Sequence, residues 1–219
     1  MDEFKVPIYL MTGFLESGKT SFLNFTLAQE YFQIDEPTLL ILCEEGEEEY
    51  DKKVLKKSRT SVEVIDSIEE LTTERLVAYD AFYNPGRVII EYNGMWQVSK
   101  LEELTFPSGW GIEQHIVTVD ASTFQVYLNN MKSLFMEMVR NADLVLFNRA
   151  DTELPLANFR RSIKVVNPGA ELIFEDEEGE IEDIFDGEMP FDVKAETIEI
   201  PNEDYGIWYL ECERPCGYL

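Results

Sequence analysis

Short apolar runs alternate along this chain with longer stretches in which apolar residues recur every three or four positions. The short runs predict buried strands at 6–11, 38–43, 61–65, 87–91, 115–120 and 143–148. The periodic stretches predict helices at 20–32, 52–57, 68–83, 96–104 and 124–140. Strands that alternate with helices predict an α/β fold, in which a mostly parallel sheet lies between two layers of helices. Ligands of such a fold bind at the carboxyl ends of the strands.

The composition changes close to Asn167-Pro168-Gly169. From Gly169 to the end there are 17 acidic residues and 2 basic ones, although apolar residues such as Trp208 and Leu210 continue. That mixture is too apolar for simple disorder. We therefore predict one α/β domain at 1–168, followed at 169–219 by a small acidic extension or by the start of a second, truncated domain.

The charge of the chain narrows the range of its partners. Its 219 residues include 18 basic and 44 acidic ones, for a net charge of −26. Nucleic acid and anionic membrane surfaces would be repelled by this charge, whereas a basic protein partner would be attracted. The alternative is that the acidic surface only aids solubility. No apolar run reaches the roughly 20 residues that span a bilayer, and residues 1–6 do not resemble a signal peptide. Three cysteines suit a reducing compartment, so we expect a cytoplasmic protein.

The first candidate site follows the first predicted strand. Residues 13–20, GFLESGKT, fit G-x-x-x-x-G-K-[ST] at every fixed position and precede a predicted helix. In a loop of this kind, backbone N–H groups and the start of the helix bind phosphate oxygens. Lys19 is expected to reach the β- and γ-phosphates, and the Thr20 hydroxyl is expected to bind Mg²⁺. The predicted phosphate-binding residues are Gly13, Phe14, Leu15, Glu16, Ser17, Gly18, Lys19, Thr20 and Ser21.

The phosphate loop alone does not distinguish ATP from GTP, but residues 148–151 bear on the choice. Asn148-Arg149-Ala150-Asp151 differs at one position from N-K-x-D, the guanine-reading motif of GTPases. The Asp151 carboxylate would accept hydrogen bonds from the ring N–H and the exocyclic amine of guanine. Arg149 would cover the base with its stem or its planar guanidinium, as Lys does with its stem. The alternative is an ordinary turn at the end of a strand.

Two acidic segments lie at other strand ends. Glu91 and Gly94 follow a buried strand, where a carboxylate would hold Mg²⁺ and a glycine N–H would meet the γ-phosphate. Glu44, Glu45 and Glu47 lie on a loop that would reach the metal or the attacking water. We predict Lys19, Glu45 and Glu47 as catalytic residues and Thr20 and Glu91 as metal ligands. The alternative for the glutamates is a solvated acidic loop.

These motifs together resemble the CobW-type GTPases, a family linked to cobalamin synthesis and metal trafficking. The segment TGFLESGKTS (12–21) is close to the family's TGFLGSGKTT, and the segments at 43–47, 90–94, 117–121 and 142–151 are similar to later family motifs. Asn167-Pro168 is similar to a late N-P turn of the family, which adds both residues to the predicted site. The resemblance covers residues 5 to about 170. It implies a P-loop GTPase domain, slow hydrolysis of GTP to GDP with Mg²⁺, and delivery of a metal such as zinc or cobalt.

The sequence departs from the family at the metal motif. Family members usually carry C-x-C-C between the second and third motifs, where this chain has no cysteine between Cys43 and Cys212. Zinc prefers thiolate and imidazole ligands, and His115 is the only histidine. Cys212 and Cys216 are a remote candidate for a metal site.

Three functions stay open at this point. The first is a GTP-binding protein whose nucleotide state switches contacts with a protein partner. The second is an ATP-dependent small-molecule kinase, for which Arg160-Arg161 would belong to a lid. The third is a non-catalytic nucleotide-binding subunit, for example one associated with a permease. The sequence does not predict an oligomeric state.

Overall fold

The computed structural model describes residues 4–44, 46, 48–176 and 179, together with two later strands. The chain divides into two compact units, Met1–Glu182 and Asp183–Leu219. The described part of the second unit is an antiparallel pair, β8 (Glu196–Glu199) with β9 (Trp208–Glu211). All the motifs considered above, apart from Cys212 and Cys216, belong to the first unit.

The first unit contains a seven-stranded sheet in the order β3-β2-β4-β1-β5-β6-β7, and every neighbouring pair is parallel. Its strands are β1 (Val6–Thr12), β2 (Thr38–Leu42), β3 (Thr60–Val64), β4 (Arg87–Glu91), β5 (Trp110–Asp120), β6 (Leu144–Asn148) and β7 (Glu171–Phe174). The predicted α/β class with a parallel sheet is confirmed. Central β4 is buried along its whole length, as its unbroken apolar run predicts.

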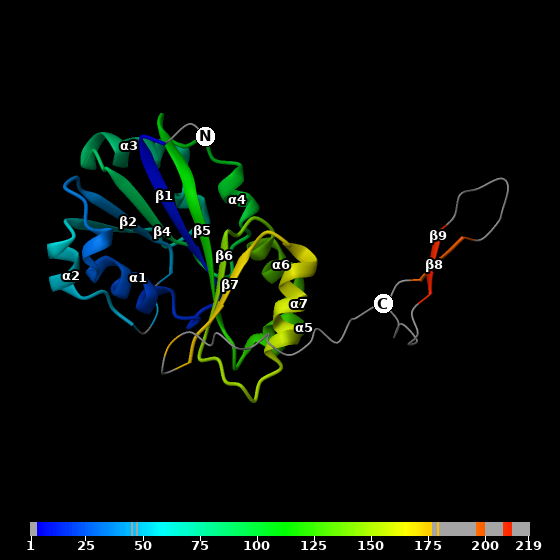
Figure 1. Cartoon of the computed structure of the whole chain (residues 1–219). Helices are drawn as coiled ribbons and strands as arrows, with labels where there is room; N and C mark the ends of the chain where they lie inside the picture. The colour runs from blue at the N-terminus through cyan, green and yellow to red at the C-terminus, as the bar shows by residue number, and fades with distance from the viewer. Residues whose placement is uncertain are drawn as a thin grey trace. The chain divides into compact units, whose positions relative to one another are not determined.

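The helices are α1 (Lys19–Ala28), α2 (Lys52–Lys57), α3 (Thr73–Tyr83), α4 (Ser99–Glu102), α5 (Phe124–Asn130), α6 (Lys132–Arg140) and α7 (Leu156–Val166). Crossovers between parallel strands are right-handed, so the strand order assigns α1 and α2 to one face and the later helices to the other. Figure 1 shows α1 and α2 beside the β2 half of the sheet and α5 to α7 beside β6 and β7.

The predicted helix at 124–140 is interrupted at Met131, whose backbone (φ −130°, ψ 32°) is not helical. Asn129 and Asn130 precede the break, and asparagine side chains compete with the helix for backbone hydrogen bonds. The Asn130 amide donates to the carbonyl oxygen of Val126 at 2.8 Å. Similarly, the predicted helix at 68–83 begins only at Thr73, because the Thr72 hydroxyl caps it by accepting from the backbone N–H of Arg75.

Two elements of the first unit were not predicted. Helix α7 buries Leu156, Phe159 and Ile163, and β7 pairs with β6. The predicted end of the first domain at residue 168 precedes β7, so the sheet continues beyond that boundary.

The core has one apolar layer on each face of the sheet. On one face, α1 contributes Leu23 and Leu27 to a cluster with Met11, Leu40, Ile89 and Ile116. On the other face, five phenylalanines (Phe124, Phe135, Phe147, Phe159 and Phe174) form a network of ring contacts. Phe14 extends this network to the phosphate loop, because its ring stacks against that of Phe135 with centroids 6.1 Å apart.

Candidate nucleotide-binding site

The loop of residues 13–18 connects β1 to α1 and has an unusual backbone. Gly13 (φ 140°), Glu16 (φ 61°) and Gly18 (φ 90°) all have positive φ, a region that side chains disfavour. Gly18 also has no room for a side chain, because a Cβ there would lie 2.4 Å from the amide nitrogen of Asn148. The glycines of the motif are therefore required by this backbone, which turns at the start of α1 as a phosphate-binding loop does.

Lys19 points back into the loop. Its Nζ donates to the carbonyl oxygens of Gly13 at 2.9 Å and Phe14 at 3.0 Å, and to Oε2 of Glu44 at 2.6 Å. The side chains of Lys19 and Glu44 are 4% and 10% exposed, so this ion pair is largely shielded from water. An anionic oxygen thus contacts Lys19 in the loop, as a phosphate oxygen of a bound nucleotide would.

Thr20 and Glu91, the predicted metal ligands, are in contact. The Thr20 hydroxyl donates to Oε1 of Glu91 at 2.8 Å, and the Tyr50 hydroxyl donates to the other carboxylate oxygen. Glu91 is buried, which raises its pKa, although the hydrogen bonds from Tyr50 and Thr20 and the charge of Lys19 partly oppose the rise. Hydroxyl and carboxylate oxygens are ligands that Mg²⁺ prefers, so the residues present fit a Mg²⁺ ion.

Gly94 lies against the phosphate loop. A Cβ at this position would be 2.3 Å from the carbonyl oxygen of Gly13 and 2.7 Å from the Cα of Phe14. The neighbouring Asn93 amide donates to the carbonyl oxygen of Cys43 at 3.2 Å. The segment after β4 therefore connects the loop to the end of β2, as expected for a second phosphate-binding element.

The segment after β6 also contacts the phosphate loop, across about 130 residues of sequence. The Asn148 amide donates to the carbonyl oxygen of Ser17 at 2.6 Å, and Nη1 of Arg149 donates to that of Glu16 at 3.2 Å. Among the described residues, Oδ1 of Asn148 is buried without a hydrogen-bond partner, whereas most buried polar atoms in proteins have one. Asp151 is exposed at the same strand end, and its carboxylate accepts from the backbone N–H of Glu153 at 2.9 Å.

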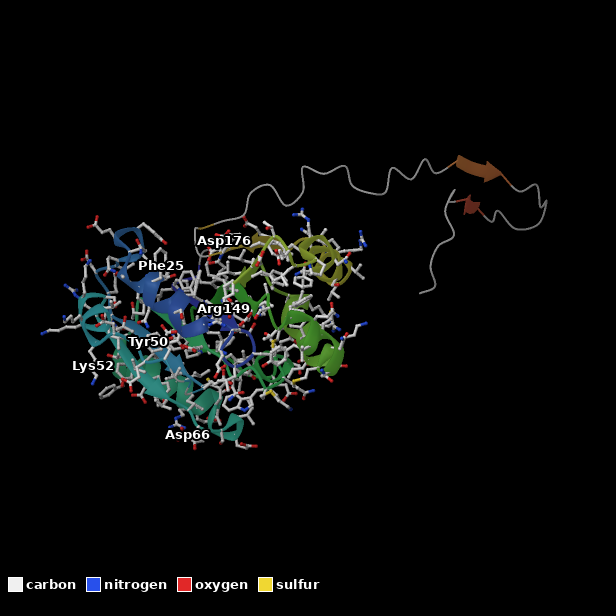
Figure 2. All side chains as sticks on the ribbon, turned by 90° about the horizontal axis from the view of Figure 1, so that it is seen from below. Phe25, Tyr50, Lys52, Asp66, Arg149 and Asp176 are labelled. Carbon is white, nitrogen blue, oxygen red and sulfur yellow. The ribbon has the colours of Figure 1, made fainter. Side chains whose placement is uncertain are left out.

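Asp120, at the end of β5, completes this edge. Its Oδ2 pairs with Arg149, and its Oδ1 accepts from the backbone N–H and hydroxyl of Ser122 at 2.9 and 2.6 Å. Burial alone would raise the pKa of Asp120, but the hydrogen bonds from Ser122 and Arg149 outweigh it and leave the pKa below its ordinary value. Figure 2 views the molecule from below, with Arg149 and Tyr50 both close to α1.

A cavity of about 260 Å³ lies over these residues. Eleven residues line it: Leu15, Glu16, Gly18, Lys19, Thr20, Ser21, Glu44, Gly46, Glu48, Glu91 and Arg149. The cavity runs from the Thr20–Glu91 contact to Arg149, so the predicted metal ligands and part of the predicted base-reading segment face one space.

The other predicted residues have different places. Phe14 belongs to the core, the Ser17 hydroxyl hydrogen-bonds that of Thr118 at 2.8 Å, and the Ser21 hydroxyl donates to Glu48. Glu45 and Glu47 lie outside the described residues, so their catalytic assignment stays a prediction. Arg160 and Arg161 lie within α7 rather than on a loop.

The structure does not bring Asn167 and Pro168 to the phosphate loop. They follow α7, which begins after the carboxyl end of β6 and returns toward the amino end of β7. The Asn167 amide donates to the carbonyl oxygens of Val139 at 2.9 Å and Ala142 at 2.8 Å. Its Oδ1 accepts from the backbone N–H groups of Gly169 and Ala170. Asn167 thus joins three segments at the opposite edge of the sheet, which accounts for this turn without a ligand.

Sequence reasoning missed Tyr50 as a site residue. It lies between the acidic loop and α2, and no motif marks it. For Asp120, the sequence contains a weak indication of a site residue, because it is the polar residue at the end of an apolar strand. No three His, Cys, Asp or Glu side chains of the described residues are grouped to hold a metal ion. Likewise, no helix within that part of the chain is long and apolar enough to cross a membrane.

The sequence model of the CobW/HypB/UreG nucleotide-binding domain matches residues 7–174. The fold is similar to that of hydrogenase maturation factor HypB from Archaeoglobus fulgidus, with 17% identity and a TM-score of 0.52, over 78% of this chain and 82% of that one. It is also similar to Zn(II)-bound YjiA GTPase from E. coli, with 20% identity and a TM-score of 0.57, over 80% of this chain but only 59% of YjiA. No curated protein matches the chain.

Proposed function

The chain belongs to the CobW/HypB/UreG family, and on this premise we propose that it binds GTP and GDP with Mg²⁺ and hydrolyses GTP slowly. One observation carries the proposal: Asn148 contacts the phosphate loop directly, with its amide 2.6 Å from the carbonyl oxygen of Ser17. Phosphates in the loop and a base beside Asn148 and Asp151 would therefore belong to a single ligand. The two carboxylate oxygens of Asp151 match the two neighbouring donors of guanine, whereas adenine offers no such pair.

The proposed roles at the phosphate end follow from the contacts of Lys19 and Thr20. A nucleotide phosphate would replace the Glu44 carboxylate at Nζ of Lys19, while the loop amides and the start of α1 bind the remaining oxygens. Thr20 and Glu91 would hold Mg²⁺, and the ion would supply positive charge to the phosphate end of the site. Tyr50 would keep the Glu91 carboxylate oriented toward Thr20.

Slow turnover is expected from the distribution of positive charge. Lys19 is the basic residue at the phosphate end of the cavity, whereas Arg149, which also lines it, is paired with Asp120 at the base end. An arginine that stabilises the transferring phosphoryl group accelerates hydrolysis by about 10³–10⁵ in related chemistry. We propose that a protein partner supplies such a group or orders the acidic loop, in which Glu45 or Glu47 would position the water.

The proposed cellular role is assistance in metal or cobalamin-related cofactor trafficking, with this domain as the nucleotide switch. The only cysteine of the phosphate-binding unit is Cys43. Burial, followed by the charges of Glu91 and Glu44, raises its pKa to about 12, so its thiol stays protonated and binds metals poorly. A cargo metal would therefore be held elsewhere than at Cys43. A free buried thiol also agrees with the reducing cytoplasm that we propose as the compartment.

Thermal unfolding with Mg²⁺ and GDP, GTP or ATP tests the nucleotide assignment. A ligand present at 100 times its dissociation constant adds about 2.7 kcal/mol to stability, or about 5–10 °C for a domain of this size. We expect this shift with GDP and GTP but not with ATP. A shift with ATP alone would overturn the guanine assignment. Release of phosphate, followed over hours, separates a slow GTPase from a non-hydrolysing regulatory subunit.

Asp151→Asn tests the base-reading role. We expect GDP affinity to fall at least tenfold, because an amide cannot accept both guanine hydrogen bonds. Xanthosine diphosphate, which has a carbonyl in place of the amine, should bind the variant better than the wild type. Glu153→Gln, which removes a neighbouring charge, is the control. Unchanged GDP affinity in Asp151→Asn would contradict the proposed base site.

A further inference from the structure

Arg149 makes two contacts that hold its guanidinium in one place. Its Nη1 donates to the carbonyl oxygen of Glu16 at 3.2 Å and also to Oδ2 of Asp120. The backbone of Arg149 has a positive φ of 50°, so the residue turns away from the direction of β6. The Arg149 side chain nevertheless remains 59% exposed. Among the described residues, only the contacts of its guanidinium therefore restrain this long side chain.

Asp120 is a fixed anchor for this guanidinium. Its side chain is only 12% exposed, and its other oxygen is held by the backbone N–H and hydroxyl of Ser122 at 2.9 and 2.6 Å. Its own backbone is fixed as well, because Asp120 is the register partner of Asn148 and the next residue, Ala121, donates to the carbonyl oxygen of Asn148 at 3.0 Å. The carboxylate is therefore placed by β5 and β6 without help from Arg149.

We propose that Asp120 is a positioning residue for guanine recognition: it holds Arg149 against the phosphate loop, so that the arginine stem covers one face of the base. This inference rests on the proposed function. A free arginine side chain has many rotamers, and an ordered ion pair removes this freedom before a ligand arrives. Asp120→Asn would keep the hydrogen bonds with Ser122 but would lose the charge that retains the guanidinium.

A thermodynamic cycle of Asp120→Asn, Arg149→Ala and the double variant, with GDP affinity measured by calorimetry, tests this role. We expect Asp120→Asn to weaken GDP binding about two- to fivefold, the range for a partly exposed ion pair. In the Arg149→Ala background the same change should have no further effect, since Asp120 acts through Arg149. Arg149→Lys should retain part of the affinity, because an ammonium can still pair with Asp120.

Two measurements separate this role from general effects of charge or stability. Glu153→Gln removes a charge from the same edge and should leave GDP affinity unchanged, and the midpoint of urea unfolding without nucleotide reports any structural damage. Inorganic pyrophosphate, which has no base, should bind Asp120→Asn and the wild type equally. Equal losses of GDP affinity from Asp120→Asn with and without Arg149 would overturn the inference. Failure of the wild type to bind GDP would instead overturn the proposed function.

Discussion

Replacing Glu44 by glutamine should strengthen nucleotide binding while it weakens the folded protein. The Glu44 carboxylate lies 2.6 Å from Nζ of Lys19; Lys19 is buried, and the Glu44 side chain is only 10% exposed. Removing one partner of a buried ion pair typically costs about 3–5 kcal/mol. Glutamine keeps an amide oxygen that can accept from Lys19, so we expect a loss of about 1–2 kcal/mol in the free energy of unfolding without nucleotide.

The free energy of the Lys19–Glu44 ion pair stabilises the folded protein but opposes nucleotide binding. If a phosphate displaces Glu44 from Lys19, the wild type must break the ion pair to bind, whereas Glu44→Gln does not. A difference of about 1–2 kcal/mol corresponds to GDP affinity that is roughly five- to thirtyfold higher. Urea unfolding without nucleotide and calorimetric titration with Mg²⁺-GDP would measure the two sides of this balance.

Glu48→Gln is the matched control for Glu44→Gln. Glu48 lines the same cavity but is exposed and bonded to the Ser21 hydroxyl rather than to Lys19. It should change GDP affinity by less than about twofold, because an exposed pair contributes little. The reasoning would be refuted if Glu44→Gln lost stability as expected but bound GDP no better than the wild type. That result would mean that Glu44 keeps a favourable contact in the bound state, for example through the metal.

Two further predictions concern the loop and the buried histidine. Gly94→Ala should lower stability by about 1–3 kcal/mol and GDP affinity by more than about tenfold, because its Cβ would lie 2.3 Å from the carbonyl oxygen of Gly13. The control is Gly169→Ala, whose Cβ would meet only Asn167, at 3.6 Å. Wild-type GDP affinity in Gly94→Ala would contradict the close approach of Gly94 to the phosphate loop. Burial lowers the pKa of His115 from 6.5 to about 4, so between these values the unfolded chain binds a proton that the folded chain does not. The free energy of unfolding should therefore fall by about 2–3 kcal/mol as the pH falls through this window. Urea unfolding at a series of pH values measures this fall, and His115→Asn should lack it.

The fold was largely predictable because most strands are continuous apolar runs. A run such as 87–91 has few alternatives once it is flanked by turns, and the structure buries it completely. Strand β7 was missed because four residues among acidic neighbours give little signal; its place is set by pairing with β6. Helix α7 did carry a signal, since Leu156, Phe159 and Ile163 have helical spacing. The break at Met131 follows Asn129 and Asn130, whose side chains compete with the helix for backbone hydrogen bonds, and the spacing of apolar residues alone does not reveal it.

The parts of the candidate site that follow short sequence motifs at strand ends were predictable. The loop at 13–20 and the segments after β4 and β6 follow local motifs, and the structure brings these segments together. Tyr50 could not be found in this way, because its contact with Glu91 depends on the path of a loop. For Asn167, a short motif similarity suggested ligand binding, whereas the structure shows its amide bonded to the carbonyl oxygens of Val139 and Ala142.

The ion pairs at the two ends of the cavity have opposite consequences for binding. The Asp120–Arg149 pair lies on the base side and leaves the Arg149 stem exposed, so a base can bind without breaking it. The Lys19–Glu44 pair, however, occupies the lysine that a phosphate needs, and its acidic partner lies on the loop that continues toward Tyr50. On the proposed function, phosphate binding would therefore displace Glu44, whereas base binding would leave Asp120 in place. A nucleotide would thus enter a site that is prepared at its base end and must rearrange at its phosphate end, which is where a switch that responds to the phosphates has to act.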